Sequence, residues 1–130
     1  MARLAAEVCG ANAEQALVLS TGVIGEFLQM EKIRRGIQAA AGKLASDESA
    51  LDAAARGVMT TDQFKKVVTR QFEIEGQVAT ITGIAKGAGM IGPKMATMLC
   101  VLMTDVPLRA NTAQQVLGEV VDHSFNCISV

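Results

Sequence analysis

The sequence has 130 residues, close to the commonest size of a single domain, and half of them are hydrophobic, although only 3% are aromatic. The formal net charge is −1, from 12 basic and 13 acidic residues, and no basic block forms the concentrated positive face that nucleic-acid binding requires. The 3 cysteines form no C-x-x-C pair and no apolar run approaches about 18 residues, so we expect neither a disulfide framework, a zinc site nor a membrane span.

The first part of the chain is predicted to be mainly helical. Residues 2–8 ("ARLAAEV") are typical of a helix that ends at Gly10. Residues 16–20 ("ALVLS") form a short apolar run that predicts a buried strand, followed by a glycine-rich loop. From Met30, apolar residues recur at spacings of three and four, which predicts an amphipathic helix. Residues 47–49 ("DES") are then expected to cap a second, alanine-rich helix.

The second part of the chain is predicted to contain more strand. Residues 64–74 and 78–85 indicate two strands joined by a hairpin turn at "EGQ". Residues 97–104 ("TMLCVLMT") are continuously apolar, as in a strand buried on both faces. Thr112 with Gln115 fits a capping box that starts a last helix, and residues 125–130 predict the beginning of another strand. The fold class predicted from this order is α/β, with a sheet layered against helices.

A glycine fingerprint lies between the second and third predicted strands. Gly87, Gly89 and Gly92 match G-x-G-x-x-G, the pattern of a loop that cradles a pyrophosphate. That function also needs a following helix and an acidic residue about 20 positions further on, and neither is present. A P-loop is excluded because Pro93 follows the last glycine. Nucleotide binding is therefore disfavoured.

Thr97 begins the apolar run after these glycines. A threonine in a half-buried strand is most often structural. It becomes a nucleophile when the chain is cut before it, because its own α-amine, with a pKa near about 8, then serves as the general base. The small residue Ala96 and the nearby Pro93 permit such a cut. The pattern alone leaves both interpretations open.

Two further segments have a functional and a structural interpretation. Residues 20–25 ("STGVIG") could offer backbone amides and a hydroxyl to an oxyanion, or could be an ordinary connection between a strand and a helix. Lys86, just before the glycines, could bind a carboxylate, or could be a solvated loop lysine. The lone His123 is assigned no role.

Four segments together resemble one family. They are "STGVIG" followed by "MEKI", "MTTD", "GIAKGAGMI" followed by "MATMLCVLMTD", and "DHSFNCISV". Their order and spacing resemble the bifunctional ornithine acetyltransferase (glutamate N-acetyltransferase) family of arginine biosynthesis. The resemblance covers nearly the whole chain and implies a layered sheet-and-helix fold of a self-processing, N-terminal-nucleophile type.

The resemblance also implies roles for individual residues. The precursor is expected to cut itself between Ala96 and Thr97, which divides the chain into residues 1–96, the end of an α chain, and residues 97–130, the start of a β chain. Thr97 would be the nucleophile that carries the acetyl group. The remaining roles are the oxyanion hole, at Thr21 and Gly22, and substrate binding, at Thr60 and Lys86.

The implied reaction moves an acetyl group from N-acetylornithine to glutamate, without a metal or organic cofactor. Bifunctional members also use acetyl-CoA. The family resemblance further implies an α/β heterotetramer in the cytoplasm, or in the mitochondrion of a eukaryote. It also implies that the chain is a fragment, with further family segments before and after it. The sequence departs from the family at Gln29, Gln63 and Lys65.

Two other functions stay open on the sequence. One is an N-terminal-nucleophile amidohydrolase or aminopeptidase of related fold, which would transfer the acyl group to water. The other is a catalytically inactive fragment that acts as a structural partner for a complementary chain.

Overall fold

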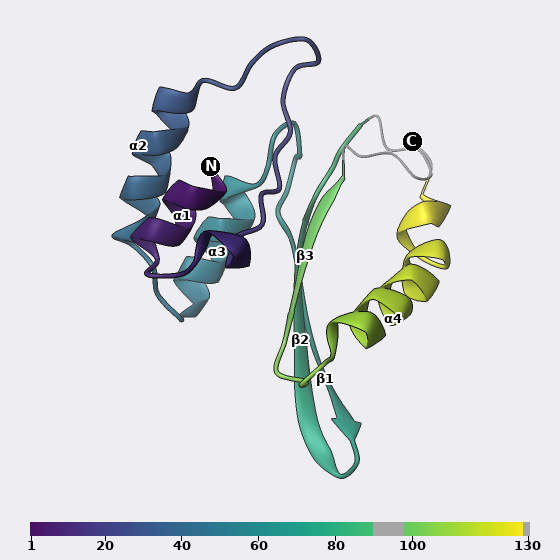
Figure 1. Ribbon diagram of the computed structural model, residues 1–130. Helices are drawn as coiled ribbons and strands as arrows, with labels where there is room; N and C mark the ends of the chain where they lie inside the picture. The colour runs from purple at the N-terminus through teal and green to yellow at the C-terminus, as the bar shows by residue number, and fades with distance from the viewer. Residues whose placement is uncertain (90–97, 129–130) are drawn as a thin grey trace. The chain divides into compact units, whose positions relative to one another are not determined.

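The computed structural model describes residues 1–89 and 98–128, which form two compact units, Met1–Asp52 and Ala53–Val130 (Figure 1). The predicted cleavage bond between Ala96 and Thr97, together with Gly92 and Pro93 of the preceding loop, lies outside the described residues.

The first unit is helical, as predicted. Its elements are α1 (Ala2–Val8), the short 3-10 helix η1 (Ala13–Gln15) and α2 (Met30–Ala41), and α3 (Glu48–Gly57) begins in it. Gly10 follows α1 with a φ of 66°, a conformation that glycine adopts without the steric cost of a Cβ. The helix α2 contacts α1. Ile33 and Ile37 are partly buried whereas Lys32 and Arg34 are exposed, which confirms the predicted amphipathic pattern.

The start of α3 is capped as its sequence predicts. Oδ1 of Asp47 accepts hydrogen bonds from the hydroxyl of Ser49 at 2.7 Å and from the backbone N–H of Ala50 at 2.8 Å. The second bond satisfies a helix-end donor that has no partner within the helix. Both bonds favour the charged carboxylate and lower the pKa of Asp47.

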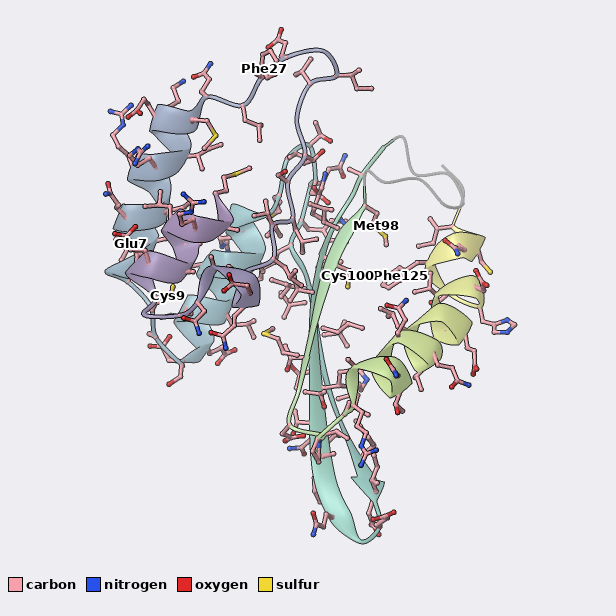
Figure 2. The ribbon with its side chains drawn as sticks, viewed as in Figure 1. Glu7, Cys9, Phe27, Met98, Cys100 and Phe125 are labelled. Carbon is pink, nitrogen blue, oxygen red and sulfur yellow. The ribbon has the colours of Figure 1, made fainter. Side chains whose placement is uncertain are left out.

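The strand predicted at residues 16–20 is wrong. These residues belong to an irregular segment between η1 and α2, and the side chain of Leu17 is 93% exposed. Phe27, further along the same segment, is also fully exposed (Figure 2). A strand needs a neighbour for its backbone N–H and C=O groups, and the first unit contains no strand among its described residues. The apolar run therefore predicted neither the burial nor the strand pairing of these residues correctly.

The second unit contains the sheet. Its strands are β1 (Lys66–Ile74), β2 (Gln77–Lys86) and β3 (Leu99–Thr104), arranged antiparallel in the order β1-β2-β3 (Figure 1). The first two form the predicted hairpin, with pairs running from Ile74↔Gln77 at the turn to Lys66↔Ala85. The turn residues Glu75 and Gly76 have φ values of 51° and 78°, as in the type I′ turns that suit the right-handed twist of a hairpin.

The third strand exists as predicted from Leu99 onward, but it is not buried on both faces. Leu102 and Met103 are 48% and 42% exposed. The reason is its position, because β3 is an edge strand of an antiparallel sheet and not a central strand of a parallel one. The buried apolar residues of the sheet lie on the central strand β2 and are Ala79 and Ile84.

The chain after the sheet forms α4 (Ala110–Asp122) and the 3-10 helix η2 (Phe125–Cys127). The capping box predicted between Thr112 and Gln115 is absent, since the N-cap is Arg109 and Gln115 donates to Glu119 at 3.1 Å instead. The strand predicted from residue 125 is wrong for residues 125–128, and residues 129 and 130 lie outside the described residues.

Local hydrogen bonds keep this last segment helical. Nδ2 of Asn126 donates to Oδ1 of Asp122 at 2.7 Å, and the backbone N–H of Cys127 donates to the carbonyl of Ser124 at 3.0 Å. The structure as a whole is mixed α and β, which confirms the predicted class at that level. Within the described part of the chain, no helix has the length and apolar character needed to cross a bilayer.

Candidate functional site: a buried carboxylate at the end of β2

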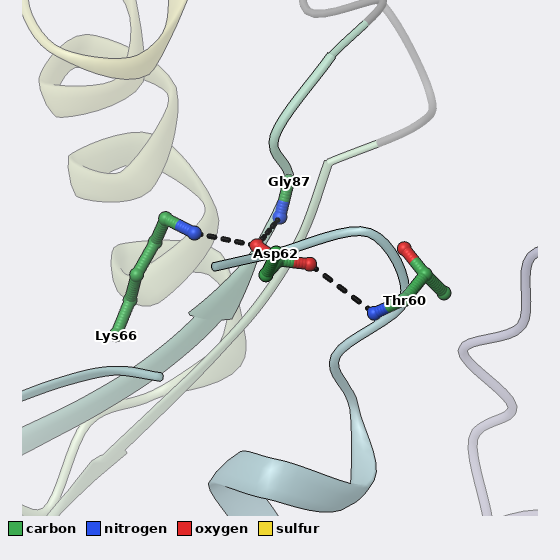
Figure 3. Close-up of polar contacts among 4 residues, drawn as sticks. All are labelled: Thr60, Asp62, Lys66 and Gly87. Atoms are coloured by element: carbon green, nitrogen blue, oxygen red, sulfur yellow. Dashed lines mark hydrogen bonds and ion pairs between the residues drawn. The ribbon is translucent and has the colours of Figure 1, made fainter. Parts of the chain in front are cut away.

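The carboxylate of Asp62 is the centre of the polar contacts in the second unit (Figure 3). Asp62 lies in the loop between α3 and β1, and its side chain is 0% exposed. Oδ1 accepts a hydrogen bond from the backbone N–H of Gly87 at 2.8 Å and also forms an ion pair with the ammonium group of Lys66. Oδ2 accepts from the backbone N–H of Thr60 at 3.2 Å. One side chain thus joins three segments of the chain.

These contacts all favour the ionised form of Asp62. The hydrogen bond from Lys66 is the largest influence and the bond from Gly87 the next, and together they hold the pKa of Asp62 far below its ordinary value. Burial opposes this effect because it disfavours a charged group. The carboxylate is therefore a permanent anion at neutral pH, and it needs each of its donors to remain buried.

Gly87 is the first glycine of the fingerprint, and its N–H binds Asp62. The φ of Gly87 is 149°, a value that residues with a Cβ rarely adopt. The backbone amide that a phosphate-binding loop would offer to its ligand is thus already occupied by a carboxylate of the protein. This contact gives a structural reason for the glycine and argues further against a nucleotide site.

Lys86 is the last residue of β2 and is only 5% exposed. The solvated loop lysine considered for this position is therefore wrong. No residue within 1–89 and 98–128 forms a hydrogen bond or ion pair with its Nζ, and the nearby carboxylate of Asp62 pairs with Lys66. A lysine whose stem is buried keeps its ammonium group within reach of solvent or of an anion. The position is suited to an anionic ligand.

Thr60 reaches the same cluster through its backbone. Its N–H is held by Asp62, whereas no hydrogen bond joins its hydroxyl to another described residue. Thr60 is exposed, so the hydroxyl is available to a ligand. The structure therefore ties Thr60 and Lys86, which are far apart in sequence, to the same carboxylate, the first directly and the second through its neighbour Gly87.

The other residues predicted to act on the substrate lie in the first unit or outside the described residues. Thr21 and Gly22 lie in the first unit, on the exposed segment between η1 and α2. A Cβ added at Gly22 would approach Cδ2 of Leu28 to 3.3 Å, so this position is locally crowded. Ala96 and Thr97 lie outside the described residues. Their roles stay predictions.

Sequence reasoning missed Asp62, although a signal was present. An acidic residue that closes the polar run "TTD" four positions before Lys66 is a candidate for an ion pair, yet Lys66 belongs to a strand and not to a helix. The contact with Gly87 spans 25 positions and depends on the hairpin register, which the sequence does not display. Across the described ranges, no group of His, Cys, Asp and Glu side chains is arranged to hold a metal ion.

An α/β unit whose central strand ends in a largely buried lysine that pairs with no described residue has a site suited to a small anionic molecule. Comparison with known proteins gives the family. The model of the ArgJ family matches residues 1–130, and the chain belongs to this family.

Several relatives are almost half identical to the chain over the residues that align with it. It is 48% identical over 130 residues to the arginine biosynthesis bifunctional protein ArgJ of Rhodopirellula baltica, covering 100% of this chain and 32% of that protein. It is 47% identical over 114 residues to the mitochondrial ArgJ protein of Schizosaccharomyces japonicus, covering 88% of this chain and 26% of that protein. It is 46% identical over 125 residues to the ArgJ protein of Methylococcus capsulatus, covering 96% of this chain and 30% of that protein. The chain spans about a third of the length of these curated relatives or less.

Proposed function

We propose that the chain contributes the nucleophile and part of the substrate site of an acetyl transfer from N-acetylornithine to glutamate in arginine biosynthesis. The observation that carries this proposal is the burial of Lys86, a residue that is 5% exposed, pairs with no described residue and directly precedes Gly87 of the Asp62 cluster. Both substrates are amino acids with an α-carboxylate, the kind of group that such a cation binds. The membership of the ArgJ family supports the same substrates.

The reaction begins with cleavage between Ala96 and Thr97, which gives Thr97 a free α-amine. This amine takes the proton of the Thr97 hydroxyl as the oxygen attacks the acetyl carbonyl of N-acetylornithine. Thr21 and Gly22 stabilise the oxyanion. The C–N bond then breaks, ornithine leaves with the proton from the Thr97 amine, and an acetyl ester remains on Thr97. The amine of glutamate attacks this ester, which gives N-acetylglutamate and restores the hydroxyl.

Thr60 and Lys86 hold the substrate during these steps. The ammonium group of Lys86 pairs with the α-carboxylate, and the hydroxyl of Thr60 donates to or accepts from the polar part of the amino acid. Fixing the carboxylate places the acetyl group at a defined distance from the nucleophile, which is the usual way in which binding contributes to the rate of group transfer.

Intact mass spectrometry of the purified chain tests the proposal. We expect two pieces that divide before Thr97, and an acetyl adduct on the piece that begins with Thr97 after addition of N-acetylornithine. Thr97→Ala should abolish both the division and the adduct. Thr112→Ala, which changes an exposed threonine at the start of α4, is the matched control and should retain both. An undivided wild-type chain without an adduct would contradict the proposal.

A related hydrolase is distinguished by the acceptor. If the acetyl ester on Thr97 is hydrolysed as fast without glutamate as with it, the reaction is that of an amidohydrolase and not of a transferase. A second candidate function, a structural partner, is favoured by the large apolar side chains exposed between η1 and α2, such as Leu17, Ile24 and Phe27. That function predicts binding to a complementary chain and no adduct.

The remaining parts of the proposal concern the assembled enzyme. We infer the layered N-terminal-nucleophile fold, an α/β heterotetramer and use of acetyl-CoA as a further acetyl donor from the family resemblance. No organic cofactor or metal is required by the chemistry above. The proposed location is the cytoplasm, or the mitochondrion in a eukaryote, since some relatives carry "mitochondrial" in their names.

A further inference from the structure

We propose that Asp62 is a positioning residue for substrate binding, which sets the places of Thr60 and Lys86 without touching the substrate itself. This inference rests on the proposed function for the identity of the substrate. It is carried by the geometry of a single carboxylate whose side chain is 0% exposed and which has three donors from three segments.

Asp62 holds the loop that carries Thr60. This loop contains no regular structure between α3 and β1, so its own backbone bonds do not fix it. The bond from the Thr60 N–H to Oδ2 of Asp62 closes a short turn within it. The bonds from Gly87 and Lys66 to Oδ1 then anchor that turn to the sheet. The backbone of Thr60 is held while its hydroxyl stays available.

Asp62 also fixes the chain directly after Lys86. Its neighbour Gly87 is the first residue beyond β2, where the ladder to β1 has ended at the pair Lys66↔Ala85. The bond of 2.8 Å to Asp62 extends the fixed part of the chain past the strand end. Because Gly87 adopts a φ of 149°, this bond also sets the direction in which the chain leaves the strand.

The charges of the cluster also differ in their partners. The carboxylate of Asp62 pairs with Lys66 and not with Lys86. Lys86 is thus kept without an internal counter-ion among the described residues, although the carboxylate of Asp62 binds the backbone of the next residue, Gly87. The side chain of Lys66 is 35% exposed, whereas Lys86 as a residue is 5% exposed. The arrangement reserves the more buried cation, Lys86, for the carboxylate of the ligand.

The chain offers a matched control at the other end of the same strand. Oδ1 of Asp105 accepts a hydrogen bond of 2.8 Å from the backbone N–H of Thr80, also across 25 positions. Thr80 lies six residues before Lys86 on β2, a separation of about 20 Å along an extended strand. Asp62→Asn and Asp105→Asn therefore make the same chemical change at opposite ends of β2, and only the first is adjacent to the proposed substrate residues.

Two measurements test the inference. Binding of N-acetylornithine is measured by isothermal titration in the Thr97→Ala background, where no turnover occurs. Formation of the acetyl adduct from p-nitrophenyl acetate is measured with Thr97 present. This ester transfers its acetyl group to the Thr97 hydroxyl and releases p-nitrophenolate, and it has no α-carboxylate that Lys86 could bind. The adduct therefore reports the nucleophile and the fold, but not the carboxylate site.

We expect Asp62→Asn to weaken N-acetylornithine binding by at least about tenfold, while the rate with p-nitrophenyl acetate changes by less than about twofold. Asp105→Asn should alter neither. The inference is overturned if Asp62→Asn leaves the affinity unchanged, if both variants weaken it equally, or if the ester rate falls in parallel, which would indicate a merely structural role. Absence of N-acetylornithine binding in the Thr97→Ala parent also overturns it. Failure of the acetyl-transfer proposal is seen separately, as a wild-type chain that binds N-acetylornithine but forms no adduct.

Discussion

The carboxylate of Asp105 accepts a hydrogen bond from the backbone N–H of Thr80 at 2.8 Å, just where the ladder between β2 and β3 ends. The carbonyl of Thr80 is bound in turn by the hydroxyl of Thr104 at 2.8 Å. Two side chains therefore complete the hydrogen bonding that the next ladder pair would have supplied. Residues at the end of β3 therefore terminate its pairing with β2 through their own side chains.

Asp105→Ala should lower the free energy of unfolding of the chain by about 1 kcal/mol, because it removes one exposed hydrogen bond to a charged acceptor. Asp105→Asn keeps an acceptor oxygen and should lower the free energy of unfolding by less than Asp105→Ala does. Urea unfolding followed by circular dichroism measures both. The Thr80 amide should also exchange with solvent faster in the alanine variant, and an unchanged exchange rate would refute the role given to this contact.

Glu75→Asn should stabilise the hairpin. Glu75 occupies a left-handed conformation, with a φ of 51°, which costs a residue with a long side chain more than it costs asparagine. Asn-Gly is the preferred pair for a type I′ turn, so the expected gain in unfolding free energy is about 0.5–1 kcal/mol.

The converse change at the next position is the control. Gly76→Ala places a Cβ at a φ of 78° and should destabilise the chain by about 1 kcal/mol. Thermal unfolding of both variants, compared with the wild type, measures the two effects. Equal shifts of the same sign would show that the turn does not have the geometry described here.

Lys86→Met should weaken the binding of N-acetylornithine without lowering the stability of the chain. Methionine fills a volume similar to that of the lysine stem without a buried charge, so the variant is expected to unfold at the same or a higher temperature than the wild type. Its affinity for N-acetylornithine should fall by about tenfold or more, because the partner of the α-carboxylate is lost. A large loss of stability together with retained binding would contradict the role of Lys86.

The stability of the second unit should depend on pH through Asp62. The pKa of Asp62 is lowered on folding, chiefly by Lys66, from an unfolded value of about 3.9. A group whose pKa is lowered on folding stabilises the folded state above its unfolded pKa, and this contribution is lost as the pH falls toward the folded value.

The difference in unfolding free energy between the wild type and Asp62→Asn should therefore be largest near neutral pH and shrink below a pH of about 4. Urea unfolding at a series of pH values between neutrality and acid measures this difference. A difference that stays constant through the acidic range would contradict the contacts assigned to this carboxylate.

The predictions that succeeded are those that depend on local sequence. The helix from Met30, the cap at Asp47 and the hairpin turn after Ile74 each have their signal within a few residues of the element. Periodicity and turn chemistry are read directly from such windows. The prediction failed at residues 16–20 because an apolar run does not say whether a partner strand is available.

The candidate site was predicted only in part, for the same reason. Lys86 and Thr60 were identified through the family resemblance, whereas the buried state of Lys86 and the presence of Asp62 follow from contacts across 25 positions. Those contacts depend on where β2 stops relative to β1, which is a property of the register. No local pattern encodes it.

That register has a consequence for insertions and deletions. The two-residue turn at Glu75 and Gly76 fixes the pairing of β1 with β2, and Lys86 lies at the far end of the same ladder, about 30 Å away along the strand. Removing one residue from the turn would shift β2 by one position and move Lys86 to the opposite face of the sheet. Changes in chain length at this distant, exposed tip should thus be as damaging to ligand binding as substitutions at the site, whereas substitutions that preserve the turn length should be tolerated.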